Sequence, residues 1–151
     1  MTGEELIRQF EDGATPADTF HHADHVRLAF EYLGRYPALE ALEKFSAALQ
    51  RFAAAQGKAQ RYHETITWAY LFLIRERQAR SGCLQTWEEF AERNADLMVW
   101  KSGVIRTLYR PETLDSDLAR QTFVLPDRFC DLAAREPTAV TGLLEAQPLR
   151  R

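Results

Sequence analysis

The four histidines are the residues of this 151-residue chain that could most clearly do chemistry, and all of them lie in its first half. His21, His22 and His25 fall within five residues, and His63 is followed directly by Glu64. Imidazole nitrogens and carboxylate oxygens are ligands with which proteins hold Zn, Fe, Ni and Cu ions. The pattern therefore predicts a divalent metal site formed by His22, His25, His63 and Glu64.

Helical geometry favours the convergence of three of these rings. At about 100° per residue, His22 falls within the apolar stripe that includes Val26, and His25 lies about 60° from His22. His63 is expected on the inward face of a second helix, whereas His21 points outward and is predicted to be solvated or part of a helix cap. Two helix N-termini that meet side by side would bring the three rings together, as in other helical bundles. The positive ends of the helix dipoles would keep the imidazoles neutral, as metal ligation requires.

A site of this composition predicts a metal-dependent enzyme acting on a small molecule. Three nitrogen ligands leave a coordination position for water or substrate, with Glu64 as a fourth ligand or as the catalytic general base toward metal-bound water. Zinc would support hydrolysis or group transfer, and iron or copper would support oxygen chemistry. Tyr62 and Thr67 are expected to orient the ligands through hydrogen bonds. The residue types do not indicate which metal, substrate or reaction is involved.

A structural role for the histidines is the alternative. An H-x-x-H pair is a weak pattern, and a purely structural network, such as Asp24 with His63 or Arg27 with Glu64, would satisfy the same side chains. The chain would then be a non-catalytic helical module that binds a small ligand or a partner protein. Against this, burying a histidine beside a glutamate is costly unless a partner compensates. Metal storage or sensing is a third alternative, and it needs no open coordination position.

The elements that must position these residues are predicted to be helices. Thr86 and Glu89 form a capping-box pattern, and Gly34 and Gly57 are expected to end two of the helices. One helix is apolar on nearly every face in its middle and is expected to be central and buried. Hydrophobic periodicity places the helices at about Met1–Asp12, His22–Leu33, Ala38–Ala55, Tyr62–Ala79 and Trp87–Arg93.

The last third of the chain is less regular. A further helix is expected over residues 97–109, weakened by Gly103, followed by a short one over 111–121 and an extended stretch at 123–126. Residues 136–151 are expected to be a weakly structured tail. The sequence thus predicts an all-α fold, a bundle of four to five main helices with a less regular C-terminal third, in a single domain spanning residues 1–135.

Composition narrows the classes of partner. A net charge of −3 gives no general basic field for nucleic acid. No apolar run is long enough to span a membrane, and residues 1–10 lack the features of a secretory signal. Cys83 and Cys130 have neither disulfide-framework nor zinc-finger spacing and are expected to be reduced thiols. A cytoplasmic protein with a small-molecule substrate or ligand is expected, and a homodimer is left open.

Two stretches resemble a family of uncharacterised bacterial helical proteins of similar length. These are Phe20–Arg27, which contains the H-x-x-H element, and Tyr62–Thr67, which contains a Y-H-E-T element; the resemblance extends from about Phe20 to Phe129 and implies no activity. The chain is more loosely similar to DinB-like four-helix proteins, in which three histidines hold a divalent metal. Those proteins carry a single early histidine and a later H-x-x-x-H pair, whereas here the pair comes first with i, i+3 spacing.

Overall fold

The computed structural model describes residues 1–82, 85–101 and 103–128, and all regular secondary structure within these ranges is helical. This confirms the predicted all-α fold, with five main helices followed by three very short ones. Cys83, Cys130 and the expected tail at 136–151 lie outside the described residues. The α-helices are α1 (Gly3–Glu11), α2 (His22–Arg35), α3 (Ala38–Ala55), α4 (Glu64–Arg80), α5 (Trp87–Arg93), α6 (Ile105–Leu108), α7 (Pro111–Leu114) and α8 (Asp117–Gln121).

Local sequence explains most helix ends. The predicted capping box of α5 is confirmed, since the Thr86 hydroxyl accepts from the Glu89 N–H and the Glu89 carboxylate accepts from the Thr86 N–H. α3 ends as expected before Gly57, whose φ of 68° suits a residue without a side chain. The expected stop at Gly34 is wrong, because α2 continues through it to Arg35. The end is set instead by Pro37, which disfavours helical backbone at the preceding residue, Tyr36.

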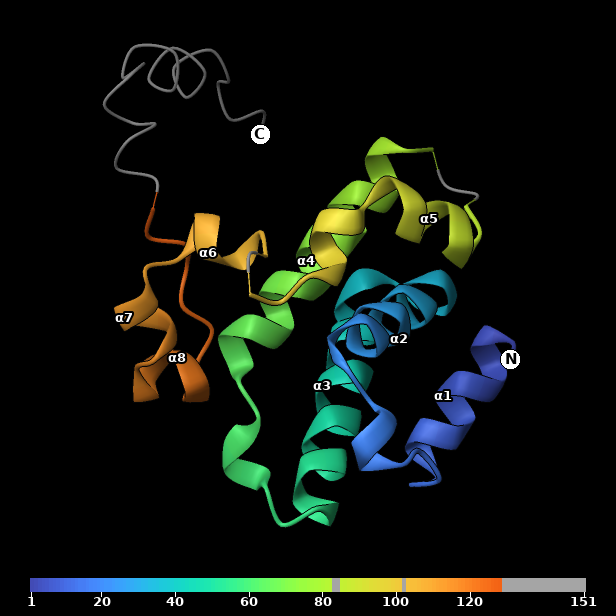
Figure 1. Ribbon diagram of the computed structural model, residues 1–151, viewed down its shortest axis with the longest axis horizontal. Coiled ribbons are helices and arrows are strands. Elements are labelled where there is room, and N and C mark those ends of the chain that lie inside the picture. Colours follow the sequence, from blue (N-terminus) through green and yellow to red (C-terminus); the bar gives the residue numbers. More distant parts are fainter. Residues whose placement is uncertain (83–84, 102, 129–151) are drawn as a thin grey trace, which may run out of the picture.

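The main helices pack around α2, which contacts α1, α3 and α4 (Figure 1). Leu28 and Tyr32 of α2 and Leu71 and Ile74 of α4 are completely buried in the shared core. Each such apolar side chain contributes roughly 1.5–3 kcal/mol to folding by leaving water. The prediction that α4 is buried all round is wrong at Phe72, which is 37% exposed. None of the helices in the described part of the chain is long and apolar enough to cross a membrane.

The helix expected over residues 97–109 is broken. The chain forms a short 3₁₀ turn, η3 (Ala95–Met98), and then α6, with Gly103 between them. A Cβ atom at Gly103 would lie 2.5 Å from the Val99 carbonyl oxygen, so the close turn of this loop requires glycine. The short helix expected over 111–121 is likewise two helices, α7 and α8, and residues 123–128 form neither helix nor strand.

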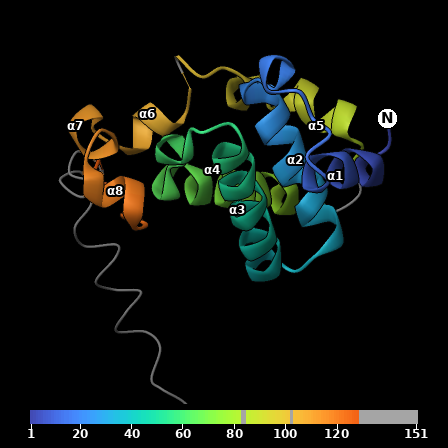
Figure 2. The ribbon, with the colours of Figure 1, turned by 90° about the horizontal axis from the view of Figure 1, so that it is seen from below.

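The three short helices lie together at one end of the molecule, next to the first half of α4, and α1 and α5 lie at the other end (Figures 1 and 2). One buried side chain ties this end to α4. The Thr65 hydroxyl donates to the Thr122 carbonyl oxygen at 2.8 Å and accepts from the Val124 N–H at 3.0 Å. A second side chain holds the same segment, because the Tyr109 hydroxyl donates to the Val124 carbonyl oxygen at 2.7 Å.

Candidate functional site

A cavity of about 810 Å³ lies where the first turns of α2 and α4, the second half of α3 and the α6–α8 end meet. This volume falls within the range that accommodates small organic ligands. Aromatic and aliphatic side chains make up much of its wall, and Phe20 and Phe52 are in contact there, with ring centroids 5.1 Å apart. Trp100 is 41% exposed and lines the same cavity.

His22, His25 and His63 all line this cavity, so both distant stretches of chain reach it. The expected convergence of the three rings on one metal ion stays a prediction. The position of His63 differs from the expectation, since it is the N-cap of α4 and not a residue on the helix face. Its Nδ1 accepts a hydrogen bond from the Ile66 N–H at 3.2 Å, and its Nε2 donates to the Leu114 carbonyl oxygen at 2.7 Å. Both ring nitrogens are therefore in use, and as arranged His63 offers no lone pair to a metal ion.

Among the described residues, His22 and His25 are each held by one ring nitrogen only. His22 Nε2 donates to the Leu97 carbonyl oxygen at 2.9 Å, and His25 Nδ1 donates to the His21 carbonyl oxygen at 3.0 Å. These bonds fix the tautomers and leave a lone pair on His22 Nδ1 and on His25 Nε2. Burial lowers the pKa of both rings and also that of His63, so all three are neutral at pH 7.

His21 lies at the start of α2 and is exposed, as predicted for a solvated or capping residue. Its backbone N–H donates to the Asp24 carboxylate at 2.8 Å, which ties down the first turn of the helix. Asp24 is thereby used as a capping group and does not serve as the expected partner of His63.

Glu64 is engaged away from the histidines. Its carboxylate accepts a hydrogen bond from the Trp68 indole one turn further along α4, in place of the expected pairing with Arg27. Within residues 1–82, 85–101 and 103–128, no three His, Cys, Asp or Glu side chains are grouped so as to hold a metal. The metal ion and the catalytic role of Glu64 stay predictions, and ligation by His63 would require its bond to Leu114 to break.

Tyr62 and Thr67 both line the cavity. Thr67 is used within its own helix, where its hydroxyl donates to the His63 carbonyl oxygen at 2.8 Å. Tyr62 is different, because its buried hydroxyl has no hydrogen-bond partner among the described residues, and the same is true of Tyr70. Burial raises the pKa of Tyr62 and outweighs the nearby Ser46, Thr67 and Gln50 side chains, which lower it, and burial raises the pKa of Tyr70 to about 12. Both phenols are therefore protonated donors.

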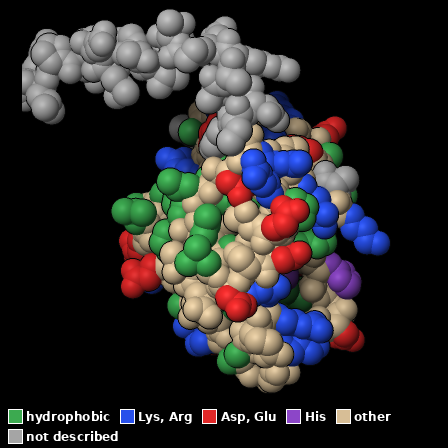
Figure 3. Space-filling view, turned by 90° about the vertical axis from the view of Figure 1, so that its left-hand side faces the viewer, with side chains coloured by type: hydrophobic (Ala, Val, Ile, Leu, Met, Phe, Trp, Pro, Cys, Tyr) green, Lys and Arg blue, Asp and Glu red, His purple; other side chains and the backbone are tan. Residues whose placement is uncertain are grey.

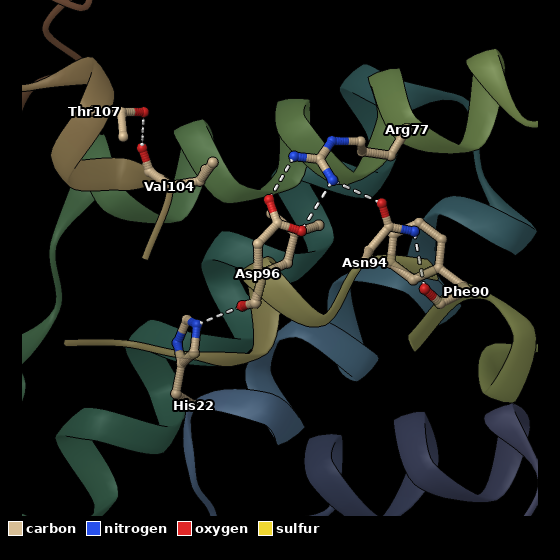
Figure 4. Close-up of polar contacts among 8 residues, drawn as sticks. His22, Arg77, Phe90, Asn94, Asp96, Val104 and Thr107 are labelled. Carbon is tan, nitrogen blue, oxygen red and sulfur yellow. Dashed lines mark hydrogen bonds and ion pairs between the residues drawn. The ribbon is translucent and has the colours of Figure 1, made fainter. Parts of the chain in front are cut away.

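A polar network that sequence reasoning missed supports His22 (Figure 4). Arg77 of α4 donates to the Asn94 side-chain oxygen at 2.8 Å and to both carboxylate oxygens of Asp96, at 3.1 and 2.8 Å. The next residue is Leu97, whose carbonyl oxygen binds His22. The adjacent Glu76 is used differently, because it forms an ion pair within α4 with Arg80.

Searches of protein-family models, of curated proteins and of solved structures each found no match to this chain. The resemblances to bacterial helical proteins and to DinB-like proteins therefore stay predictions. The composition and geometry of the cavity are therefore the evidence on which a function can be proposed.

Proposed function

We propose that this protein binds a small organic molecule in the cavity between α2, α3, α4 and the α6–α8 end. The observation that carries the proposal is a cavity of about 810 Å³ whose wall combines aromatic side chains with His22 and His25, each of which keeps a free lone pair on one ring nitrogen. Small-molecule sites in proteins have this composition, an apolar wall with a few polar groups that orient the ligand.

The two histidines would orient the ligand in such a complex. Each retains one unprotonated ring nitrogen, which accepts a hydrogen bond. The fixed tautomers make these nitrogens acceptors at neutral pH without any rearrangement. The cavity therefore suits a ligand with an apolar body and a hydrogen-bond donor.

Binding can be tested with phenyl-naphthylamine, a neutral aromatic fluorophore that brightens in apolar surroundings. We expect saturable binding by the wild-type protein and an affinity about tenfold or more lower in Ala53→Trp, because Ala53 lines the cavity and the indole would occupy it. Ala54→Trp is the matched control, since Ala54 is exposed on the same helix and should leave affinity unchanged. Absence of binding, or equal loss in both variants, would refute the proposal.

A metal-dependent enzyme is the second candidate, and the free lone pairs of His22 and His25 on one cavity favour it. Release of His63 from Leu114 would complete the three-histidine site, with Glu64 as fourth ligand or general base. Elemental analysis of untagged protein tests this candidate. Near-stoichiometric metal that is lost in His25→Ala/His63→Ala would support it, and a stable wild-type protein without metal would exclude it.

A further inference from the structure

The rim of the cavity carries an excess of positive charge. Four cationic side chains line it, Lys58, Arg61, Arg106 and Arg120, against two carboxylates, Asp18 and Asp115. The whole chain has the opposite sign, with a net charge of −3. Figure 3 views the face formed by the α6–α8 end and shows blue Lys and Arg side chains beside a hollow with a purple histidine at its edge.

These cations come from separate parts of the chain. Lys58 and Arg61 belong to the turn before α4, which includes the 3₁₀ turn η2 (Ala59–Arg61), and Arg106 and Arg120 belong to α6 and α8. Within the described residues none of the four forms an ion pair with a carboxylate. Unlike the paired Arg77, they therefore keep their hydrogen-bond donors available.

Two of these charges act on groups inside the cavity. The positive charge of Arg106 partly opposes the rise in the pKa of the Tyr70 hydroxyl, and that of Arg120 adds to the lowering of the pKa of His63. Both guanidinium groups thus lie near enough to influence buried side chains. Asp96 and Asp115 act on the same two groups in the opposite direction. Because four cations line the cavity against two carboxylates, an anion at the rim would still meet a net positive charge.

We infer that the ligand of this cavity is an amphipathic organic anion, an apolar or aromatic body carrying a carboxylate or phosphate group. The body fills the aromatic interior, and Arg61, Arg106 and Arg120 hold the anionic oxygens at the rim. Guanidinium groups suit this task because their planar donors match both kinds of oxyanion. The inference rests on the proposed function, to which it adds the charge and chemical class of the ligand.

Two fluorophores with the same ring system but different charge test the inference. Anilinonaphthalene sulfonate is the anionic counterpart of the neutral phenyl-naphthylamine. We expect the wild-type protein to bind the anionic probe about five to ten times more tightly at low salt, the size of effect that two or three exposed charge contacts give. The preference should shrink as salt is added, because ions screen exposed charges.

The variant Arg106→Gln/Arg120→Gln should weaken binding of the anionic probe about five to ten times more than binding of the neutral probe, and so abolish the preference. Arg75→Gln/Arg93→Gln removes the same charge from exposed positions outside the cavity and should keep the preference. Equal affinities for the two probes in the wild-type protein, or a preference that survives in Arg106→Gln/Arg120→Gln, would overturn the inference. Absence of neutral-probe binding by the wild-type protein would instead refute the proposed function. Failure of the inference and failure of the proposed function are therefore distinguishable.

Competition separates the two kinds of anion. Naphthoate, naphthyl phosphate and the neutral naphthalenemethanol are added in turn to protein loaded with the anionic probe. Stronger displacement by naphthoate identifies a carboxylate ligand, and stronger displacement by naphthyl phosphate identifies a phosphate ligand. Displacement by the alcohol as effective as that by both anions would overturn the inference.

Discussion

Replacing Thr65 by valine should loosen the α6–α8 end from the rest of the molecule. The side chain is completely buried at the start of α4, and its single hydroxyl makes both a donated and an accepted hydrogen bond to the chain at Thr122 and Val124. Valine has the same shape without the hydroxyl. Each hydrogen bond contributes about 0.5–1.5 kcal/mol net, so the variant should lose about 2 kcal/mol of unfolding free energy.

Thr67→Val is the matched control, because Thr67 is also buried in α4 and also has a bonded hydroxyl. That hydroxyl donates to the His63 carbonyl oxygen, which already accepts from the Thr67 backbone N–H at 3.0 Å. The acceptor therefore stays satisfied, and the cost should be under about 0.5 kcal/mol. The difference between the two variants isolates the link between α4 and the C-terminal segment.

Urea unfolding followed by circular dichroism gives the two free energies, and hydrogen exchange measured by mass spectrometry locates the change. Peptides that cover α8 and Thr122 should exchange faster in Thr65→Val and at the wild-type rate in Thr67→Val. The assignment of Thr65 as the link would be refuted if the two variants lost the same stability, or if exchange rose evenly over the whole chain.

Three further outcomes are expected. Burial lowers the pKa values of His22, His25 and His63 from the ordinary value of 6.5, so the unfolded state binds more protons than the folded state. Urea unfolding should therefore show full stability above about pH 6.5 and progressive loss as the pH falls below it. Gly103→Ala should cost about 1–3 kcal/mol in the same assay, because a carbonyl oxygen lies 2.5 Å from the new methyl group; an unchanged midpoint would contradict this. Arg77→Met keeps the aliphatic stem and removes the donors to a buried asparagine oxygen, so a loss of about 1–2 kcal/mol is expected, and a change below about 0.3 kcal/mol would argue against the network.

The fold was largely predictable because its long helices have strong local signals. Periodic apolar positions gave the bounds of α3 to the residue, and the hydroxyl and carboxylate at Thr86 and Glu89 marked the start of α5. The break between η3 and α6 was not predictable in this way. It depends on the close approach of Gly103 to Val99, a contact that periodicity does not contain.

The candidate site was predictable in its location and not in its hydrogen bonds. Residue type and spacing brought His22, His25 and His63 to one cavity. The partners of His22 and His63 are backbone carbonyl oxygens, at Leu97 and Leu114, and every residue has such a group. A pattern of side chains therefore cannot distinguish a ring held by the backbone from one that is free to bind a ligand.

The cluster of positive charge at the cavity rim was likewise not predictable from the sequence. Each of its arginines is ordinary in sequence, exposed and more than ten residues from the next, and only the approach of α6 and α8 to the turn before α4 collects them. The net charge predicts only that the surface as a whole has no general basic field. It does not predict the local excess of positive charge at the rim of the cavity.

The residues that line the cavity run from Ala17 to Arg120, so a bound molecule would contact segments that lie far apart in the sequence. Any compound that prefers the folded state raises the melting temperature in proportion to the logarithm of its concentration over its dissociation constant. A compound library can therefore be ranked by thermal shift alone, with no assay of turnover and no prior choice of reaction. The Ala53→Trp protein would serve as the counter-screen for hits that bind elsewhere.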